Sequence, residues 1–239
     1  MTVVPALTRA GAVAAFSTRK GGGASPFGMN LSFKVGDDEE AVRANRELFF
    51  GSLGVGLHEL AIPVQIHGAG IRRVAASGLY PDIDGLITDT KRVFLCVSVA
   101  DCVPILLFAP ERGAVGAFHA GWRGTAARIA SSGVERMKSE FGAEPRSMLA
   151  FIGPAAGGCC YEIGEEVARR LDSRFVLRDG SRLRADLKGA NAAQLEEAAI
   201  PVGNIEVHPG CTIMEPEVFH SYRRDGKRSG RMMAVIGIP

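Results

Sequence analysis

The chain has no long apolar run and no marked excess of one charge. It carries 28 Lys and Arg against 26 Asp and Glu, a formal net charge of +2, and only residues 222–231 are locally basic. No apolar segment approaches the roughly 18 residues of a membrane span. The first nine residues lack the apolar core of a signal peptide. These absences predict a soluble, cytoplasmic protein with no nucleic-acid or membrane partner.

Histidine is scarce, which excludes several kinds of metal enzyme. The five histidines are too few for a multi-copper oxidase centre, which needs many more imidazoles. The His-Glu-x-x-His helix of zinc proteases is absent. The His-x-Glu and Pro-Cys-x-x-Cys signature of zinc nucleobase deaminases is absent as well. The five cysteines are an odd number, and Cys159 and Cys160 are adjacent. This usage indicates reduced thiols or a metal site and not a disulfide framework.

The remaining composition is that of an ordinary globular protein. The chain is 46% hydrophobic and 23% charged, and no segment resembles a linker. We therefore expect one domain over residues 1–239. Strands and helices are mixed without strict alternation, which favours an α+β fold or a layered sandwich with mixed sheets.

Apolar patterns and turn residues predict the positions of the elements. Strands are expected at 12–17, 61–67, 71–75, 94–99, 103–108, 146–152, 205–208 and 232–238. Helices are expected at 37–50, at 125–141, over about nine residues after 164, and from a cap at 186 to 199.

The stretch 94–125 organises the chain. Its apolar runs 94–99 and 103–108 are short and rich in β-branched and aromatic residues, so they predict buried strands. Cys102 lies at the break between these runs, and His119 lies where the next strand ends before Gly121. Sites in α/β proteins are built at strand ends and helix N-termini. The pattern therefore predicts a functional site at Cys102 and His119.

His67, Cys102 and His119 are candidate metal ligands. His67 and Gln65 alternate with apolar neighbours, so both are expected on one face of the strand 61–67. Two imidazoles and one thiolate, with an open fourth position, suit a catalytic zinc, and the same set also suits copper. A metal-free Cys–His pair and plain packing remain open alternatives.

Two arginines are candidate anion-binding residues. Arg19 precedes the glycine run that includes Gly21 and Gly22, where backbone N–H groups can turn towards one anion. Arg123 lies at the predicted N-terminus of a helix. The alternative is a flexible turn with solvated charges. Asp101, beside Cys102, is a candidate for proton transfer or a turn carboxylate. Asp84 either holds a ligand or begins a turn.

Six motifs together resemble one family over nearly the whole chain. They are Ser17-Thr-Arg-Lys-Gly-Gly-Gly-Ala-Ser25, Gln65-Ile-His67-Gly, Ala100-Asp-Cys-Val-Pro104, His119-Ala-Gly-Trp-Arg-Gly124, Ile152-Gly-Pro154 with Cys160-Tyr-Glu-Ile-Gly164, and Ser221-Tyr-Arg-Arg-Asp225. In this order they are similar to the laccase-domain family of multicopper polyphenol oxidases, also called the YfiH family. The resemblance implies a four-layer α/β/β/α sandwich, similar to that of a bacterial cytotoxic deamidase.

The resemblance also implies an activity and a site. It implies zinc held by His67, Cys102 and His119, and phosphorolysis of adenosine, inosine, guanosine and methylthioadenosine, with adenosine deamination beside it. On this basis Asp101, Arg19, Cys102 and His119 are the expected catalytic residues. Phosphate or substrate binding is expected from Arg19, Gly21, Gly22, Gln65 and Arg123. The expected assembly is a monomer or weak homodimer.

The sequence departs from the family pattern in two places that affect the base preference. His220 follows Phe219 where the family often has two Phe, and Gly157-Gly158 precedes the adjacent cysteines. Three rival functions remain. They are copper-dependent phenol oxidation, a metal-free hydrolase or deamidase using Cys102 and His119, and a non-enzymatic partner protein.

Overall fold

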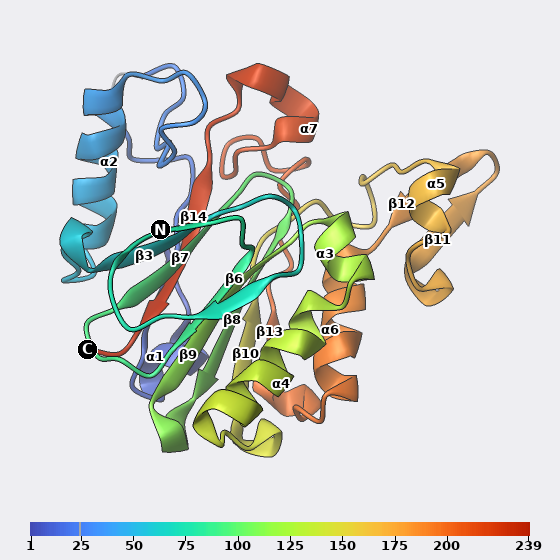
Figure 1. Ribbon diagram of the computed structural model, residues 1–239. Helices are drawn as coiled ribbons and strands as arrows, with labels where there is room; N and C mark the ends of the chain where they lie inside the picture. Colours follow the sequence, from blue (N-terminus) through green and yellow to red (C-terminus); the bar gives the residue numbers. More distant parts are fainter. Residues whose placement is uncertain (24) are drawn as a thin grey trace.

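The protein is built from four layers, as a computed structural model shows. It describes residues 1–23 and 25–239, so Ala24 of the glycine motif lies outside the described residues. Two six-stranded sheets pack face to face, and helices cover the outer side of each sheet (Figure 1). The predicted α/β/β/α sandwich with mixed sheets is confirmed.

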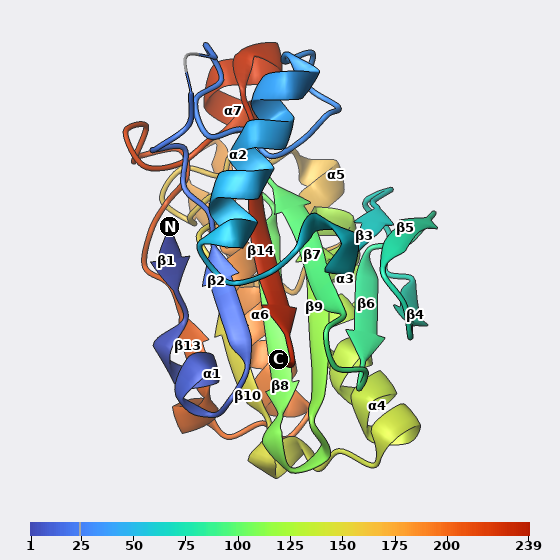
Figure 2. The same cartoon turned by 90° about the vertical axis from the view of Figure 1, so that its left-hand side faces the viewer.

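The first sheet contains six strands in a mixed arrangement. Their order is β1 (Thr2–Val3), β2 (Val13–Phe16), β14 (Met232–Gly237), β7 (Phe94–Val99), β3 (Leu60–Val64) and β5 (Gly78–Pro81). β14 pairs antiparallel with β2 and β7, whereas β3 pairs parallel with β7 and β5. The last strand of the chain therefore lies near the middle of this sheet (Figure 2).

The second sheet has the same number of strands. Their order is β13 (Ile205–Val207), β10 (Leu149–Ile152), β8 (Val103–Ala109), β9 (Ala114–Ala120), β6 (Gly85–Thr88) and β4 (Ile71–Arg73). β8 and β9 form an antiparallel hairpin in which Val103 lies opposite Ala120. This register places the start of β8 and the end of β9 at the same edge of the sheet.

Helices complete the outer layers. The α-helices are α1 (Pro5–Arg9), α2 (Glu39–Gly51), α3 (Trp122–Ala126), α4 (Ile129–Phe141), α5 (Glu165–Ala168), α6 (Leu187–Glu197) and α7 (Tyr222–Asp225). The 3-10 helices cover Leu57–Glu59, Pro110–Arg112, Pro145–Ser147, Ser173–Phe175, Val202–Asn204 and Gly226–Arg228. α2 covers the first sheet, and α4 and α6 cover the second (Figure 1). A hairpin of β11 (Val176–Asp179) and β12 (Arg182–Ala185) extends to one side with α5.

The uninterrupted apolar runs of the central strands follow from burial on both faces. Along β8, Leu106 and Phe108 face the layer between the sheets, whereas Ile105 and Leu107 pack against the helices. Successive side chains of a strand point to opposite faces, so a strand covered on both sides needs apolar residues throughout. This pattern explains why the runs 94–99 and 103–108 predicted their strands closely.

Several predicted elements have other bounds in the structure: the strand expected at 71–75 ends at Arg73, and that expected at 146–152 begins at Leu149. The strand expected to reach His67 ends at Val64, so Gln65 and His67 lie in the following loop. The helix expected over 125–141 is interrupted at Arg128, whose backbone is left-handed with φ 61°. The helix of about nine residues is only Glu165–Ala168. Within the described part of the chain, no helix has the length and apolarity needed to cross a membrane.

Candidate active site

The three predicted metal ligands meet at one point between the sheets. Cys102 directly precedes β8, and His119 is the penultimate residue of β9, so the hairpin register brings them together. His67 arrives from the loop after β3 of the first sheet. The ligand atoms of all three residues lie within 4.8 Å of one another. The two imidazole rings are nearly perpendicular, with centroids 4.8 Å apart.

Asp84 fixes both histidines. Its carboxylate is fully buried and accepts hydrogen bonds from the backbone N–H groups of Ile66, His67 and Gly68. It also lies 2.8 Å from Nδ1 of His119. Because this contact engages Nδ1, the other ring nitrogen of His119 is left for an ion. The same carboxylate holds the left-handed backbone of His67, with φ 60°. Asp84 therefore does more than begin a turn.

Gly121 borders the cluster on a further side. A Cβ atom built on this glycine would lie 3.2 Å from Sγ of Cys102 and 3.3 Å from Cδ2 of His67. These separations are tighter than most real Cβ contacts, so a side chain here would press on two ligands. The space beside the sulfur is thus kept by the absence of a side chain.

Cys102 and His119 form a charged pair in the absence of an ion. Burial alone would raise the pKa of Cys102, but the charge of His119 and hydrogen bonds from His119 and His67 lower it to about 6. Burial opposes charge on His119, whereas the Cys102 thiolate and Asp84 raise its pKa to about 9. At neutral pH the pair is therefore a thiolate and an imidazolium, and the thiolate is the form that binds metals.

Asp101 is held in a strained position next to Cys102. Its backbone φ of 90° is rare for a residue with a side chain. Its carboxylate accepts hydrogen bonds from the Thr212 hydroxyl at 2.7 Å and from the Arg223 backbone N–H at 2.6 Å. Its carbonyl accepts from the N–H of Ala156 at 2.9 Å. Contacts from distant segments support this conformation, as strained residues require.

A cavity of about 770 Å³ opens beside these residues. His67, Cys102, His119 and Asp101 line it together with Gln65. Its other polar and aromatic lining residues are Ser32, Phe33, Lys34, Arg46, Ser98, Trp122, Tyr161, Tyr222, Arg223 and Arg231. Its size lies within the usual range of small-molecule sites, which is roughly 300 to 1,000 Å³.

The glycine loop and its arginine lie outside this cavity lining. The guanidinium of Arg19 donates to the carbonyl of Pro216 at 2.8 Å and lies 4.0 Å from the Asp225 carboxylate. Gly22 packs against the backbone of Gly28 so closely that no Cβ would fit. Neither Arg19 nor Gly21 nor Gly22 lines the cavity. The close backbone approach at Gly22 accounts for one glycine of the run without a ligand.

The other two predicted binding residues differ from each other. Arg123 does not line the cavity, and its guanidinium lies 4.3 Å from the ring centroid of Trp122. Gln65 lines the cavity, but its amide exchanges two hydrogen bonds of 2.8 Å with the backbone of Ser98. This exchange joins the loop of His67 to β7. The binding roles of these residues stay predictions.

Sequence reasoning did not single out the arginines that line the cavity. They are Arg46 on α2, Arg223 on α7 and Arg231 before β14. Burial lowers the pKa of Arg46 and of Arg231, both half-buried. Among residues 1–23 and 25–239, no carboxylate lies within 4.0 Å of their charged groups. Uncompensated cations in a cavity wall are suited to bind an anion.

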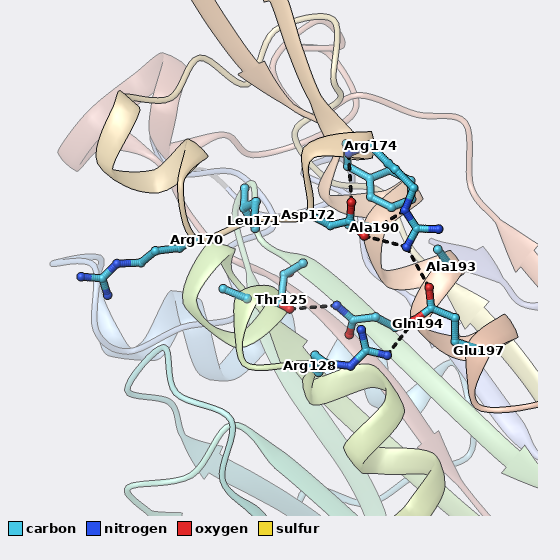
Figure 3. Close-up of a pocket in the computed structure, with 12 residues that line it drawn as sticks. Thr125, Arg128, Arg170, Leu171, Asp172, Arg174, Ala190, Ala193, Gln194 and Glu197 are labelled. Atoms are coloured by element: carbon cyan, nitrogen blue, oxygen red, sulfur yellow. Dashed lines mark hydrogen bonds and ion pairs between the residues drawn. The ribbon is translucent and has the colours of Figure 1, made fainter.

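A smaller cavity of about 120 Å³ lies between α3, α6 and the segment around Arg174 (Figure 3). Its arginines are already neutralised. Arg128 lies 2.7 Å from Glu197, and Arg174 contacts both Asp172 and Glu197. These ion pairs leave no free cation at Arg128 or Arg174, so this cavity is a weaker candidate for an anionic ligand.

Comparison with known proteins agrees with the geometry. Residues 13–239 match the family described as multi-copper polyphenol oxidoreductase laccase. The chain belongs to this family. A purine nucleoside phosphorylase of Deinococcus radiodurans is 41% identical over 231 residues, covering 94% of this chain and 88% of that protein. Among the relatives of this laccase-domain family is also a protein named adenosine deaminase RL5, from an unknown prokaryotic organism, 35% identical over 94% of this chain and 93% of its own length.

Solved structures of the laccase-domain family share the fold. The crystal structure of YlmD from Geobacillus stearothermophilus matches with a TM-score of 0.91 and 38% identity, covering 98% of this chain and 94% of that one. The hypothetical protein YfiH of Bacillus licheniformis matches with the same TM-score at 35% identity, covering 95% and 93%. The predicted resemblance is therefore confirmed.

Proposed function

We propose that this protein is a purine nucleoside phosphorylase that also deaminates adenosine. The observation that carries the proposal is the shared cavity, whose lining includes the His67–Cys102–His119 cluster and three arginines. A phosphorolytic enzyme needs a subsite for an anionic nucleophile and a second subsite for the base. The names of the relatives support the same activity.

Phosphate would bind to the cavity arginines. Backbone carbonyls fix all three: Nε of Arg46 donates to Leu31 at 2.8 Å, Arg223 donates to Glu162 at 2.6 Å, and Arg231 donates to Ser229 at 2.7 Å. A guanidinium held in one orientation can donate to two phosphate oxygens at once. Burial of Arg46 and Arg231 strengthens their attraction for phosphate by lowering the local dielectric.

The reaction exchanges one bond to the ribose for another. A phosphate oxygen forms a bond to C1′ while the bond from C1′ to N9 of the purine breaks. The electron pair of that bond goes to the purine, which takes up a proton, and the products are ribose 1-phosphate and the free base. Phe33, Tyr161 and Tyr222 in the lining each have an arginine over one face of the ring, so a purine would stack on the other face. Asp101 is our proposed proton carrier, beside Cys102.

The residues of the cluster fit a single metal ion. Asp84 engages Nδ1 of His119, so its other nitrogen can bind an ion once its proton is released. Cys102 is a thiolate at neutral pH, and Gly121 leaves room beside its sulfur. His67, Cys102 and His119 would hold zinc, with copper as the alternative. When bound, the ion supplies Lewis acidity towards the base or towards water. We place the enzyme in the cytoplasm, because free thiols suit a reducing compartment. We expect it to act as a monomer or weak homodimer.

The charged pair also favours a second candidate, a Cys–His hydrolase that works without metal. A thiolate beside an imidazolium is the arrangement of an activated cysteine nucleophile. This candidate predicts inhibition by alkylation of Cys102 and no effect of chelators.

The deciding experiment measures purine release from adenosine and inosine with and without phosphate. We expect phosphate-dependent formation of ribose 1-phosphate, lost in Cys102→Ala and His119→Ala. Arg231→Ala should raise the KM for phosphate by at least about tenfold, the effect of losing one charge-assisted contact. Arg19→Ala, outside the lining, tests the predicted phosphate role of that residue. Phenol oxidation in proportion to bound copper, without purine release, would replace this proposal by the oxidase.

A further inference from the structure

Three cysteines form a second cluster away from the metal-ligand cluster. Cys159 and Cys160 lie in the loop before α5, and Cys211 follows β13, about 50 residues further along the chain. The sulfur of Cys159 lies 3.1 Å from that of Cys160 and 3.8 Å from that of Cys211. All three sulfurs lie within 4.8 Å of one another.

We propose that Cys159, Cys160 and Cys211 form a second metal site, which binds one zinc ion through three sulfurs. Zinc binds thiolates at ~2.3 Å in a tetrahedron, so two bound sulfurs lie ~3.8 Å apart. The observed separations of 3.1 and 3.8 Å require only small movements to reach that geometry. A thiol proton is released to solvent for each sulfur that becomes a ligand.

The backbone around Cys211 is fixed before any ion binds. Gly157 donates its N–H to Sγ of Cys211 at 3.3 Å, and Ala155 pairs with Cys211 in a parallel bridge. The N–H of Cys211 donates to the carboxylate of Glu215 at 2.8 Å. These contacts join the two segments that carry the sulfurs. The site is therefore largely preformed, and ordering it costs little conformational entropy.

A buried cation compensates the charge of the cluster. The ammonium of Lys188 donates to the carbonyls of His208, Pro209 and Gly210, at 2.8, 3.2 and 3.0 Å. This places its charge close enough to interact with Cys159 and Cys211. Three thiolates and a zinc ion carry a net negative charge, which a neighbouring cation stabilises. The carboxylates of Asp186 and Glu215 also act on this ammonium, so the cluster shares the cation with them.

The position of the site indicates a structural function. Cys159 and Cys160 are followed directly by Tyr161, which lines the large cavity. An ion would fix that part of the cavity wall without touching the substrate. The proposal of this second metal site does not rest on the proposed phosphorylase activity.

Metal counting in variants tests the proposal. The apo-protein, reduced and freed of metal with a chelator, is titrated with Zn²⁺ and with Cd²⁺. Native mass spectrometry then counts the ions, and thiolate-to-cadmium absorption identifies sulfur ligation. We expect two ions per chain in the wild type. Cys211→Ser should bind one ion with purine release unchanged, and Cys102→Ser should bind one ion with purine release lost.

Two further variants guard the interpretation. Cys96→Ala, at a buried cysteine that belongs to neither cluster, should retain two ions. Cys160→Ser, at a less buried position, replaces Cys211→Ser if that variant unfolds. One ion in the wild type, lost completely in Cys102→Ser, overturns the proposal. So does a Cys159–Cys211 disulfide whose reduction leads to no metal uptake. The number of bound ions tests the second metal site even if the protein releases no purine.

Discussion

The two sulfur-containing clusters differ in their surroundings, although each brings together ligands from distant segments. The His67–Cys102–His119 cluster opens into a large cavity, is oriented by the buried carboxylate of Asp84, and adjoins strained backbone. The Cys159–Cys160–Cys211 cluster has sulfur ligands only and a buried ammonium beside it. Each cluster offers three protein ligands, but of the two only the first lines the large cavity, so the first suits catalysis and the second suits structure. The surroundings of the ligands thus distinguish a catalytic from a structural metal site, which the ligand types alone do not.

The largest expected difference between the two clusters is the pH at which their thiols react. In the metal-free protein, Cys102 should become a thiolate as the pH rises through about 6, because His119 stabilises its charge against burial. Burial and the neighbouring sulfurs raise the pKa of Cys160, so it should react only in alkaline solution. Iodoacetamide labelling at a series of pH values, read by peptide mass spectrometry, measures both. Equal midpoints for the two residues would contradict the comparison.

Asp84→Asn should weaken metal binding at the first cluster by about 10–100-fold, the usual effect of losing such a partner of a metal histidine. The amide removes the charge that orients His119. Competition with a chromophoric chelator measures the affinity. The Cys159–Cys160–Cys211 cluster serves as the internal control, and a loss at both clusters would mean general unfolding.

Alanine substitutions at Gly121 and Gly157 should each lower metal affinity at one cluster only, by a smaller factor than Asp84→Asn. A Cβ on Gly157 would lie 3.2 Å from Sγ of Cys159, as a Cβ on Gly121 would from Sγ of Cys102. Neither glycine has a positive φ, so alanine meets only the sulfur atoms and their neighbours. Gly121→Ala should lower affinity several-fold at the first cluster only, and Gly157→Ala at the second only. Crossed effects would show that the clusters are coupled.

His220→Phe tests a buried group that belongs to neither cluster. Burial and the charges of Arg19 and Arg231 lower the pKa of His220 to about 4, against an opposing effect of Asp225. Below pH 6.5 the unfolded chain gains a proton there before the folded protein does. Stability should therefore fall as the pH drops from 6.5 to 4, by at most about 3 kcal/mol.

In His220→Phe this part of the pH dependence should disappear, as urea unfolding at several pH values would show. His58→Gln, at an exposed histidine, is the control. Metal binding at both clusters should stay unchanged. An unaltered slope between pH 6.5 and 4 would mean that other groups cause it.

The sequence predicted those features that depend on local patterns of residues, which are the buried strands and the ligands at their ends. Runs buried on both faces predicted β7 and β8, and from these the meeting of Cys102 with His119 followed. The cavity arginines were not predicted, because Arg46 and Arg231 stand among other charged residues and only tertiary packing removes their ion-pair partners. Asp84 had two open interpretations, since nothing local shows that its carboxylate collects donors from 66–68 and 119.

The contacts of Asp101 also determine when the site can form during synthesis. Its hydrogen bonds reach Thr212 and Arg223, which are 111 and 122 residues away in the chain. β14, the last strand, separates β2 from β7 in the first sheet. A nascent chain that ends before residue 232 can contain every metal ligand, yet β2 and β7 would lack the strand between them. Activity should therefore appear only after β14 has left the ribosome and inserted between β2 and β7.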